Sequence, residues 1–250
     1  VLSMRRDVRP LCFPAPAPEQ LRSDDRVVLE STQKGVLELP AIVHGPIEYA
    51  IVARLCRTPV TPNALTLFAA LVAWSATALF VSGRFVQGLA VAVLVGVLDG
   101  LDGKLARAKL ETSKLGELEH FSDFLFELSW WAAIAWSLHA SGLHPWAPWA
   151  FLARYVAEGL DGLAKLFSIR RLGRMIDDVS PTMRVVRLVG GRRNVYVWIL
   201  ACGVLARHAP TAYALLPVWA GATAVAHLGG LTWHLLAGRD GVPARPALAE

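Results

Sequence analysis

The sequence predicts an all-α integral membrane protein, with six transmembrane helices preceded by an amphipathic interfacial helix. Hydrophobic residues make up 54% of its 250 residues and charged residues only 18%. The apolar residues form blocks of about 20, the length that a helix needs to cross the hydrocarbon core of a bilayer. Basic residues gather in alternate connections between these blocks, as expected of loops that stay in the cytosol. A soluble domain would instead disperse its apolar residues at the helix or strand period.

Residues 1–43 predict a loosely structured cytosolic N-terminal extension. The segment is polar and only weakly periodic, and its first part contains Pro10, Pro14, Pro16 and Pro18. Proline fixes the backbone and removes a hydrogen-bond donor, so this spacing opposes regular structure. The chain begins at Val1, and the extension has the character of a tail that follows an upstream domain.

A short amphipathic helix is expected at residues 46–57, lying on the membrane surface. Arg54 and Arg57 lie beside an apolar face formed by Ile47, Ile51 and Leu55. Interfacial helices have this pattern because one face enters the acyl region while the cations meet the headgroups. A turn with two prolines, Thr58–Asn63, then leads into the first span.

Six apolar segments define a membrane domain at residues 44–238. Their approximate limits are 64–82, 86–108, 115–140, 146–167, 194–207 and 211–236. The loops after the first, third and fifth segments carry only Arg84, His144 and Arg207 as basic residues. The other two loops are strongly basic, with Lys104, Arg107, Lys109 and Lys114 in one and Arg170, Arg171, Arg174, Arg184, Arg187, Arg192 and Arg193 in the other. The positive-inside rule therefore predicts a multi-pass protein of the cytoplasmic membrane, with both termini, including a tail at 239–250, in the cytosol.

Acidic residues occur where the second segment ends and the third begins. Asp99 and Asp102 are three residues apart, so both carboxylates project from one helix face. Glu119, Asp123 and Glu127 recur at every fourth residue and share a face of the next helix. Ionisable groups at membrane depth are costly and usually serve a site or a polar pathway. These acids predict an active site that faces the cytosol.

Facing carboxylates repel one another unless cations lie between them. Carboxylate oxygens are preferred ligands of hard cations, so Mg²⁺ or Mn²⁺ is expected on Asp99, Asp102, Glu119 and Asp123. A metal pair held in this way clamps a diphosphate and stabilises charge while a P–O bond breaks. Arg107, one turn beyond Asp102, is a forked donor suited to phosphate oxygens.

The run from Asp99 to Gly116 resembles the signature of class I CDP-alcohol phosphatidyltransferases, D-x₂-D-G-x₂-A-R-x₈-G-x₃-D-x₃-D. The matching residues are Asp99, Asp102, Gly103, Ala106, Arg107 and Gly116. Thr58–Asn63 is similar to the TP-x-TPN element that precedes the first span in that family. The resemblance implies transfer of a phosphoalcohol from a CDP-alcohol to a hydroxyl acceptor, with release of CMP, in phospholipid or polyol-phosphate synthesis. It also implies two divalent ions, a base at the last acid, a homodimer, and CDP contacts from Asn63, Asp99, Asp102, Gly103, Ala106 and Arg107.

The sequence departs from this signature after Gly116. Strict spacing puts the third acid at His120 and the fourth at Phe124, which can neither bind a metal nor accept a proton. The acids lie one residue earlier, at Glu119 and Asp123, and keep their own interval. A loop shortened by one residue, or an earlier helix entry, returns both to the site. We therefore expect an active enzyme with Asp123 as the base.

The loop between the fourth and fifth segments carries seven arginines within residues 170–193. The positive-inside bias and attraction to anionic lipid explain most of them. A subset, Lys165, Arg192 and Arg193, is expected to bind an anionic acceptor such as a sugar phosphate or inositol phosphate. Members of the resembled family that use inositol phosphates place arginines in comparable positions.

Two alternatives use the same residues. A proton- or cation-coupled transporter would use the acids as a relay and would stagger them through the thickness of the membrane. A catalytically silent, CDP-binding paralogue would account for the displaced third and fourth acids. The enzyme hypothesis predicts a CDP-alcohol donor, a phosphorylated hydroxyl acceptor and the lipid bilayer as partners, and no nucleic acid.

Overall fold

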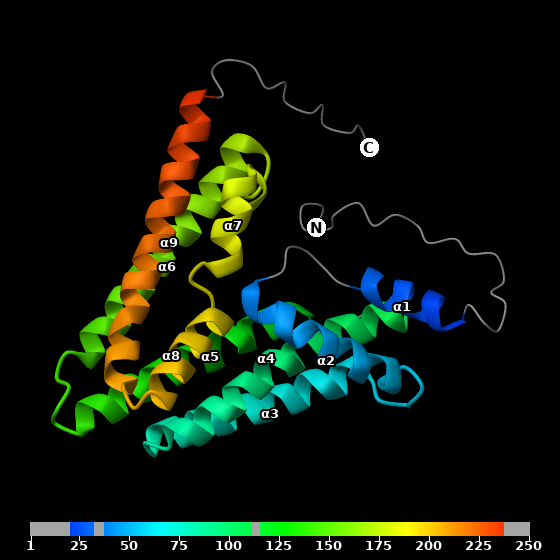
Figure 1. The fold of residues 1–250 in the computed structure, drawn as a ribbon, viewed down its shortest axis with the longest axis horizontal. Coiled ribbons are helices and arrows are strands. Elements are labelled where there is room, and N and C mark those ends of the chain that lie inside the picture. Colours follow the sequence, from blue (N-terminus) through cyan, green and yellow to red (C-terminus); the bar gives the residue numbers. More distant parts are fainter. Residues whose placement is uncertain (1–20, 33–37, 112–115, 238–250) are drawn as a thin grey trace.

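The computed structural model describes residues 21–32, 38–111 and 116–237, and within them the side chains of 21–24, 116–120 and 237 are left out. The described residues form helices and contain no strand. The elements are α1 Leu21–Ser31, α2 Leu39–Leu55, α3 Pro62–Val81, α4 Phe85–Ala108, α5 Gly116–Ala140, α6 Ala147–Leu172, the 3₁₀ turn η1 Ile176–Asp178, α7 Pro181–Val189, α8 Arg193–Leu205 and α9 Ala209–Ala237. Figure 1 shows α2, α3 and α4 lying together, while α6 and α9 form a long pair that carries η1 and α7 near one end.

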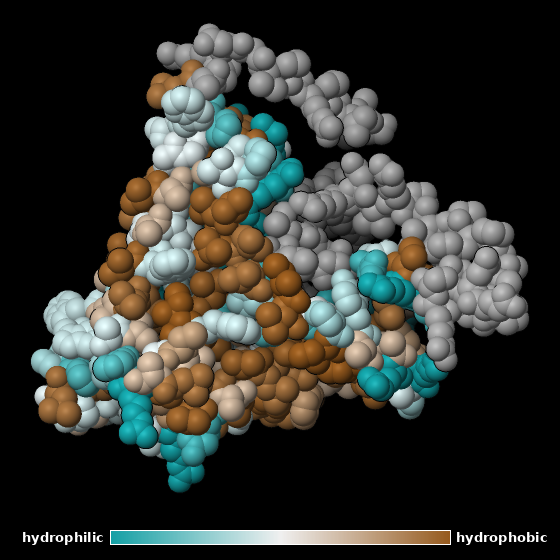
Figure 2. Space-filling model, in the orientation of Figure 1, coloured by the Kyte–Doolittle hydropathy of each residue, from teal (hydrophilic) through white to brown (hydrophobic). Residues whose placement is uncertain are grey.

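The six predicted apolar segments coincide with α3, α4, α5, α6, α8 and α9, and their limits agree within a few residues. Three of these helices, α3, α4 and the Ala209–Leu236 part of α9, are long and apolar enough to cross a membrane, and α8 is a shorter apolar helix. Apolar side chains cover much of the face shown in Figure 2, which fits contact with lipid. Membrane crossing by the other three helices stays a prediction.

Local sequence signals explain where several helices begin and end. Thr61 caps α3 by accepting a hydrogen bond from the backbone N–H of Ala64, and Pro62 occupies the first turn, where its missing N–H costs nothing. Ser180 caps α7 in the same way. Gly173 ends α6 at φ 67°, in the left-handed region that favours glycine.

Helix α2 differs from the predicted interfacial helix at 46–57. It begins at Leu39, so the predicted start at Pro46 is wrong, and Pro46 lies inside the helix. The earlier start is explained by Pro40, which occupies the first turn, where proline favours helix initiation. Its interfacial position stays a prediction.

The N-terminal extension predicted at 1–43 is described only from residue 21 onward. Helix α1 and the first turns of α2 lie inside this segment. The predicted C-terminal tail at 239–250 lies outside the described residues.

The main core is formed by α3, α4, α5, α6, α8 and α9 around two buried tryptophans. Trp130 Nε1 donates to the Ala73 carbonyl over 2.8 Å, and the Tyr213 hydroxyl donates to the Trp131 carbonyl over 2.9 Å. These bonds satisfy the polar ends of large aromatic side chains inside an apolar environment. The core fixes α5 against α3, and so fixes the position of the acidic segment of α5.

Candidate active site

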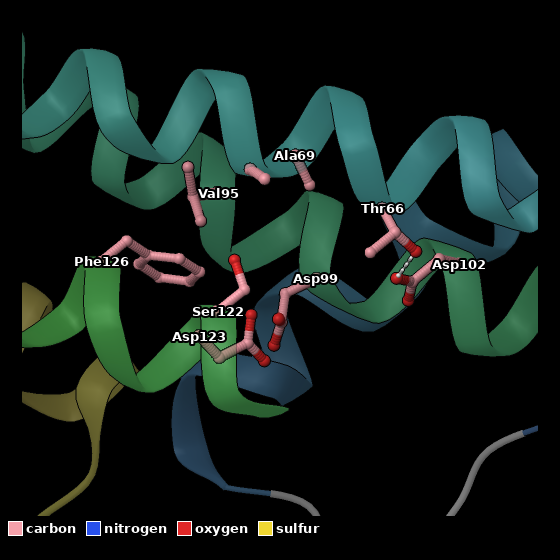
Figure 3. A pocket seen from close by; sticks show the side chains of 9 residues that line it. Thr66, Ala69, Val95, Asp99, Asp102, Ser122, Asp123 and Phe126 are labelled. Carbon is pink, nitrogen blue, oxygen red and sulfur yellow. Dashed lines mark hydrogen bonds between the residues drawn. The ribbon is translucent and has the colours of Figure 1, made fainter. Parts of the chain in front are cut away.

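The predicted carboxylates of α4 and α5 line one small pocket between these helices and α3. Asp99 and Asp102 come from α4 and Asp123 from α5, and Figure 3 shows the side chains that surround them. The complete lining is Thr66, Ala69, Ala70, Val95, Asp99, Asp102, Ser122, Asp123 and Phe126. The cavity measures about 20 Å³, room for about one water molecule. A diphosphate therefore needs the pocket to open.

Asp102 is the more buried of the two carboxylates on α4, with 5% of the residue exposed. The Thr66 hydroxyl donates to its Oδ2 over 2.7 Å, as the dashed line in Figure 3 marks, and the backbone N–H of Gly103 donates to its Oδ1 over 2.6 Å. Thr66 lies one turn inside α3, so packing of α3 against α4 positions this carboxylate.

Asp99 is paired with a residue that is distant in the sequence. Arg193, the first residue of α8, donates from Nη2 to Asp99 Oδ2 over 2.5 Å. Its guanidinium also lies 5.2 Å from the ring centroid of Phe126 and interacts electrostatically with Glu127 and Asp123. The sequence predicts Arg193 as an acceptor ligand, whereas in the structure it contacts the carboxylates.

The register of α5 places Asp123, and not Phe124, in the pocket. Asp123 lines the cavity, while Phe124 is 53% exposed. Helix α5 begins at Gly116, so the backbone of Glu119 and His120 lies in its first turns. The side chains of Glu119 and His120 are outside the described residues.

The predicted CDP-binding residues lie in the C-terminal half of α4 and in the first turn of α3. Arg107 Nε donates to the Thr32 carbonyl over 2.5 Å, and a Cβ on Gly103 would come within 3.2 Å of Arg107 Nη1. Glycine at 103 therefore lets the guanidinium lie close to the helix. Ala106 lies one turn after Asp102 on α4, and Asn63 is exposed in the first turn of α3.

The three described carboxylates do not form a closed metal cage. Among the described side chains, no group of three or more His, Cys, Asp or Glu is close enough to hold a metal ion. The donor chemistry nevertheless fits a hard divalent cation, because three carboxylates line one pocket. Arg193 is paired with Oδ2 of Asp99, so an ion at that oxygen would have to displace the guanidinium.

The other two predicted acceptor residues, Lys165 and Arg192, are each paired with an acid. Lys165 Nζ donates to Asp161 Oδ2 over 2.5 Å, and Arg192 Nη2 lies 3.5 Å from Asp177 Oδ2. Arg187 Nη1 donates to the same oxygen of Asp177 over 2.5 Å. The position of Asp177 among seven arginines is the feature of the sequence from which this cluster could have been predicted.

Asp177 is 1% exposed and lies against His227 of α9, which is itself hydrogen-bonded to Asp161 of α6. The distance from His227 Nε2 to Asp177 Oδ1 is 3.2 Å. Burial acts to raise the pKa of Asp177, but His227, Lys165 and Arg187 outweigh it and hold the pKa well below its usual range. Asp177 is therefore ionised and joins η1 to α6, α7 and α9.

A second buried ionic cluster lies farther along α5 and α6. Arg154 is 1% exposed, donates to Glu158 Oε1 over 2.8 Å, and lies 3.5 Å from Glu127 Oε1. Its guanidinium is within 5 Å of the ring centroids of Trp131 and Tyr196. The buried guanidinium of Arg154 is thus paired with carboxylates of both α5 and α6.

Comparison with known proteins agrees with the geometry of the site. A model of the CDP-alcohol phosphatidyltransferase family matches residues 59–171. The bifunctional IPC transferase and DIPP synthase of Aquifex aeolicus (strain VF5) is 29% identical over 152 residues, which are 56% of this chain and 31% of that protein. The match thus spans about a third of the length of the relative. Asp99, Asp102 and Asp123 lie inside the residues that match the family model.

Proposed function

We propose that the protein transfers a phosphoalcohol group from a CDP-alcohol to a hydroxyl acceptor and releases CMP. The observation that carries this proposal is the pocket in which carboxylates from α4 and α5 meet inside the family domain. The relative from Aquifex aeolicus supports an acceptor of the polyol-phosphate class.

Asp99, Asp102, Glu119 and Asp123 are proposed to hold two Mg²⁺ or Mn²⁺ ions. Bound divalent cations supply charge neutralisation for the diphosphate and for the CMP that leaves. The fit of three carboxylates to a hard cation supports this assignment, and the pairing of Asp99 with Arg193 shows that the pocket already attracts a positive charge.

In the proposed reaction, an acceptor hydroxyl oxygen forms a bond to the β-phosphorus of the donor. Asp123 takes the proton of that hydroxyl, and the bond between the β-phosphorus and the bridging oxygen breaks. The electron pair of this bond leaves with CMP. Arg107 binds the diphosphate together with Asn63, Gly103 and Ala106, since guanidinium groups match phosphate oxygens in charge and geometry.

Lys165, Arg192 and Arg193 are proposed to bind the phosphate of the acceptor. Arg192 and Arg193 are adjacent at the start of α8, and one is paired with Asp177 while the other is paired with Asp99. The start of α8 thus lies between the arginine-rich loop and the carboxylate pocket. An acceptor phosphate bound here would bring its hydroxyl groups towards Asp123.

The proposed membrane arrangement has six crossings, by α3, α4, α5, α6, α8 and α9. The alternation of basic loops supports a cytosolic active site and cytosolic termini, with α2 at the interface. The protein is proposed to act as a homodimer in the cytoplasmic membrane.

A relay for protons or cations is the competing function, because Glu127, Glu158 and Asp161 extend the acids along α5 and α6. Each of them has a basic partner nearby, Arg154 or Lys165. Paired charges favour a structural role in these helices over a conducting path.

The test is CMP release by purified protein in the presence of Mg²⁺, with CDP-diacylglycerol and other CDP-alcohols as donors and several polyol phosphates as acceptors. The products are identified by mass spectrometry. The proposal predicts one donor and acceptor pair that gives CMP and the joined phosphodiester in equal amounts. No CMP release from any pair, together with proton flux in proteoliposomes, would favour the relay instead.

A further inference from the structure

Helix α2 packs on α4 through side chains that recur at every fourth residue. His44, Glu48 and Val52 are buried, with 3%, 5% and 0% of each residue exposed. Residues four apart share one face of a helix, so this face of α2 is directed at α4. The apolar side chains Ile42, Val43 and Ile47 are about half exposed on other parts of α2. The buried face of α2, which packs on α4, therefore contains a histidine and a carboxylate, His44 and Glu48.

Two glycines of α4 form the hollow that receives these side chains. A Cβ on Gly100 would lie 2.5 Å from Glu48 Oε2, and a Cβ on Gly96 would lie 3.0 Å from the His44 ring. Both distances are shorter than an ordinary van der Waals contact, so only glycine allows this approach. Gly100 is a variable position of the signature, and its role here is to admit Glu48.

The carboxylate of Glu48 is paired with Lys104 of α4. Lys104 is 3% exposed, donates to Glu48 Oε2, and lies 4.4 Å from the ring centroid of Tyr49. A buried ammonium is costly unless it has a partner, so the pair constrains both helices. The sequence places Lys104 among the basic residues of a cytosolic loop, whereas in the structure it is a buried residue of α4.

This ion pair lies on the stretch of α4 that carries the carboxylate pocket. Gly100 directly follows Asp99, and Lys104 is two residues beyond Asp102. On the α3 side, Thr66 holds Asp102. The segment from Asp99 to Lys104 is therefore fixed from two sides, by α3 and by α2.

We propose that Glu48 and Lys104 form a buried clamp through which α2 sets the position of Asp99 and Asp102, so that Glu48 is a positioning residue for donor binding. The proposal rests on the proposed function for its catalytic consequence, but the clamp itself is a property of the fold. Glu48 lies outside the matched family domain, on a helix that precedes it.

The experiment compares the parent protein with Gly100→Ala and Glu48→Gln. Gly100→Ala displaces the Glu48 carboxylate without removing a charge, and Glu48→Gln removes the charge while nearly keeping the shape. Gly45→Ala on α2 is the matched control, because a Cβ there meets nothing within 4 Å. It has the same effect on helix propensity as Gly100→Ala.

Acylation of lysines in the purified full chain, followed by mass spectrometry, measures the clamp. Lys104 should resist acylation in the parent and in Gly45→Ala, and should react in both other variants, with the chain unfolded in denaturant as the reference for full reactivity. The equilibrium affinity for CMP in the presence of Mg²⁺ should weaken about tenfold in the same two variants. This factor is the lower end of the loss that is typical when a residue supporting metal ligands is removed. The double variant Glu48→Lys, Lys104→Glu should recover part of that affinity.

Two results would overturn the proposal. Reactivity of Lys104 in the folded parent equal to that in the unfolded chain would show that the clamp does not form. Exposure of Lys104 in the variants with unchanged CMP affinity would show that the clamp holds α2 without positioning the site. If the parent binds CMP but turns over no donor, the transferase proposal fails while both readouts still decide on the clamp.

Discussion

The carboxylates of Asp99 on α4 and of Asp177 in η1 are both paired with arginine, but they are held in different ways. Asp99 has one guanidinium partner and a side chain that is 32% exposed, and it borders a cavity. Asp177 is 1% exposed and lies against Arg187, Arg192 and His227. The first arrangement can exchange its partner for a ligand, whereas the second is surrounded by groups of the protein. The difference separates the proposed active site from a structural junction, although both contain arginine and aspartate.

The largest effect should come from a substitution in the proposed active site. Asp123→Asn removes the proposed base, and loss of a general base lowers turnover by about 10³-fold. CMP release under saturating substrates measures the change, and Ser122→Ala, another residue of the pocket lining, is the control. Retained turnover in Asp123→Asn would remove Asp123 as the base.

The next effect should come from the structural junction. Asp177→Asn leaves several cations without their anionic partner and should lower the free energy of unfolding by about 3 kcal/mol. The neighbouring Asp178→Asn is the matched control, since Asp178 is 44% exposed and lies 4.0 Å from Arg184. That change should cost less than about 0.5 kcal/mol, as is usual for an exposed pair. Equal losses in detergent-solubilised protein would contradict the distinction between the two regions.

A smaller effect is expected at Thr66, which holds Asp102 in the carboxylate pocket. Thr66→Val removes the hydroxyl that donates to Asp102. A hydrogen bond to a charged group is worth about 1.5 kcal/mol, and this corresponds to about tenfold in kcat/KM. Steady-state kinetics measure it. An unchanged kcat/KM would show that α3 does not position Asp102 for the reaction.

The smallest effect near neutral pH should be the pH dependence of the stabilisation that Asp177 provides. The pKa of Asp177 is lower in the folded protein than in the unfolded chain, where it is about 3.9. The stabilisation is therefore complete above that value and is lost as the pH falls towards the folded pKa. The difference in stability between the parent and Asp177→Asn should shrink as the pH falls below about 4. Thermal unfolding across this range measures it.

Much of the architecture could be predicted from sequence because hydrophobic blocks and caps are local signals. The six apolar helices and the turn before Pro62 follow from such signals. The start of α2 was missed, since the apolar residues on its exposed side suggested a surface helix beginning at Pro46. The buried face of α2 is polar, and its partners are distant in the sequence.

The candidate site, too, could be predicted from sequence only in part. The spacing of Asp99, Asp102 and Asp123 was enough to predict one pocket. The pairing of Arg193 with Asp99 and of Arg192 with Asp177 could not be predicted, because adjacent arginines at a helix start carry no information about which acid each one meets. Such choices depend on how α8 packs against α4 and η1.

The charges of α6 have a consequence for how the chain enters the membrane. Arg154 pairs with Glu158, and Asp161 pairs with Lys165, each within one turn of the same helix. A lone charge at the centre of a spanning helix costs about 3 kcal/mol on insertion. Because α6 brings its own counter-ions, its charges are neutralised before α5, α8 or α9 has packed beside it. In the proposed six-span arrangement, integration of α6 by the translocation machinery therefore does not have to wait for the later helices to be synthesised.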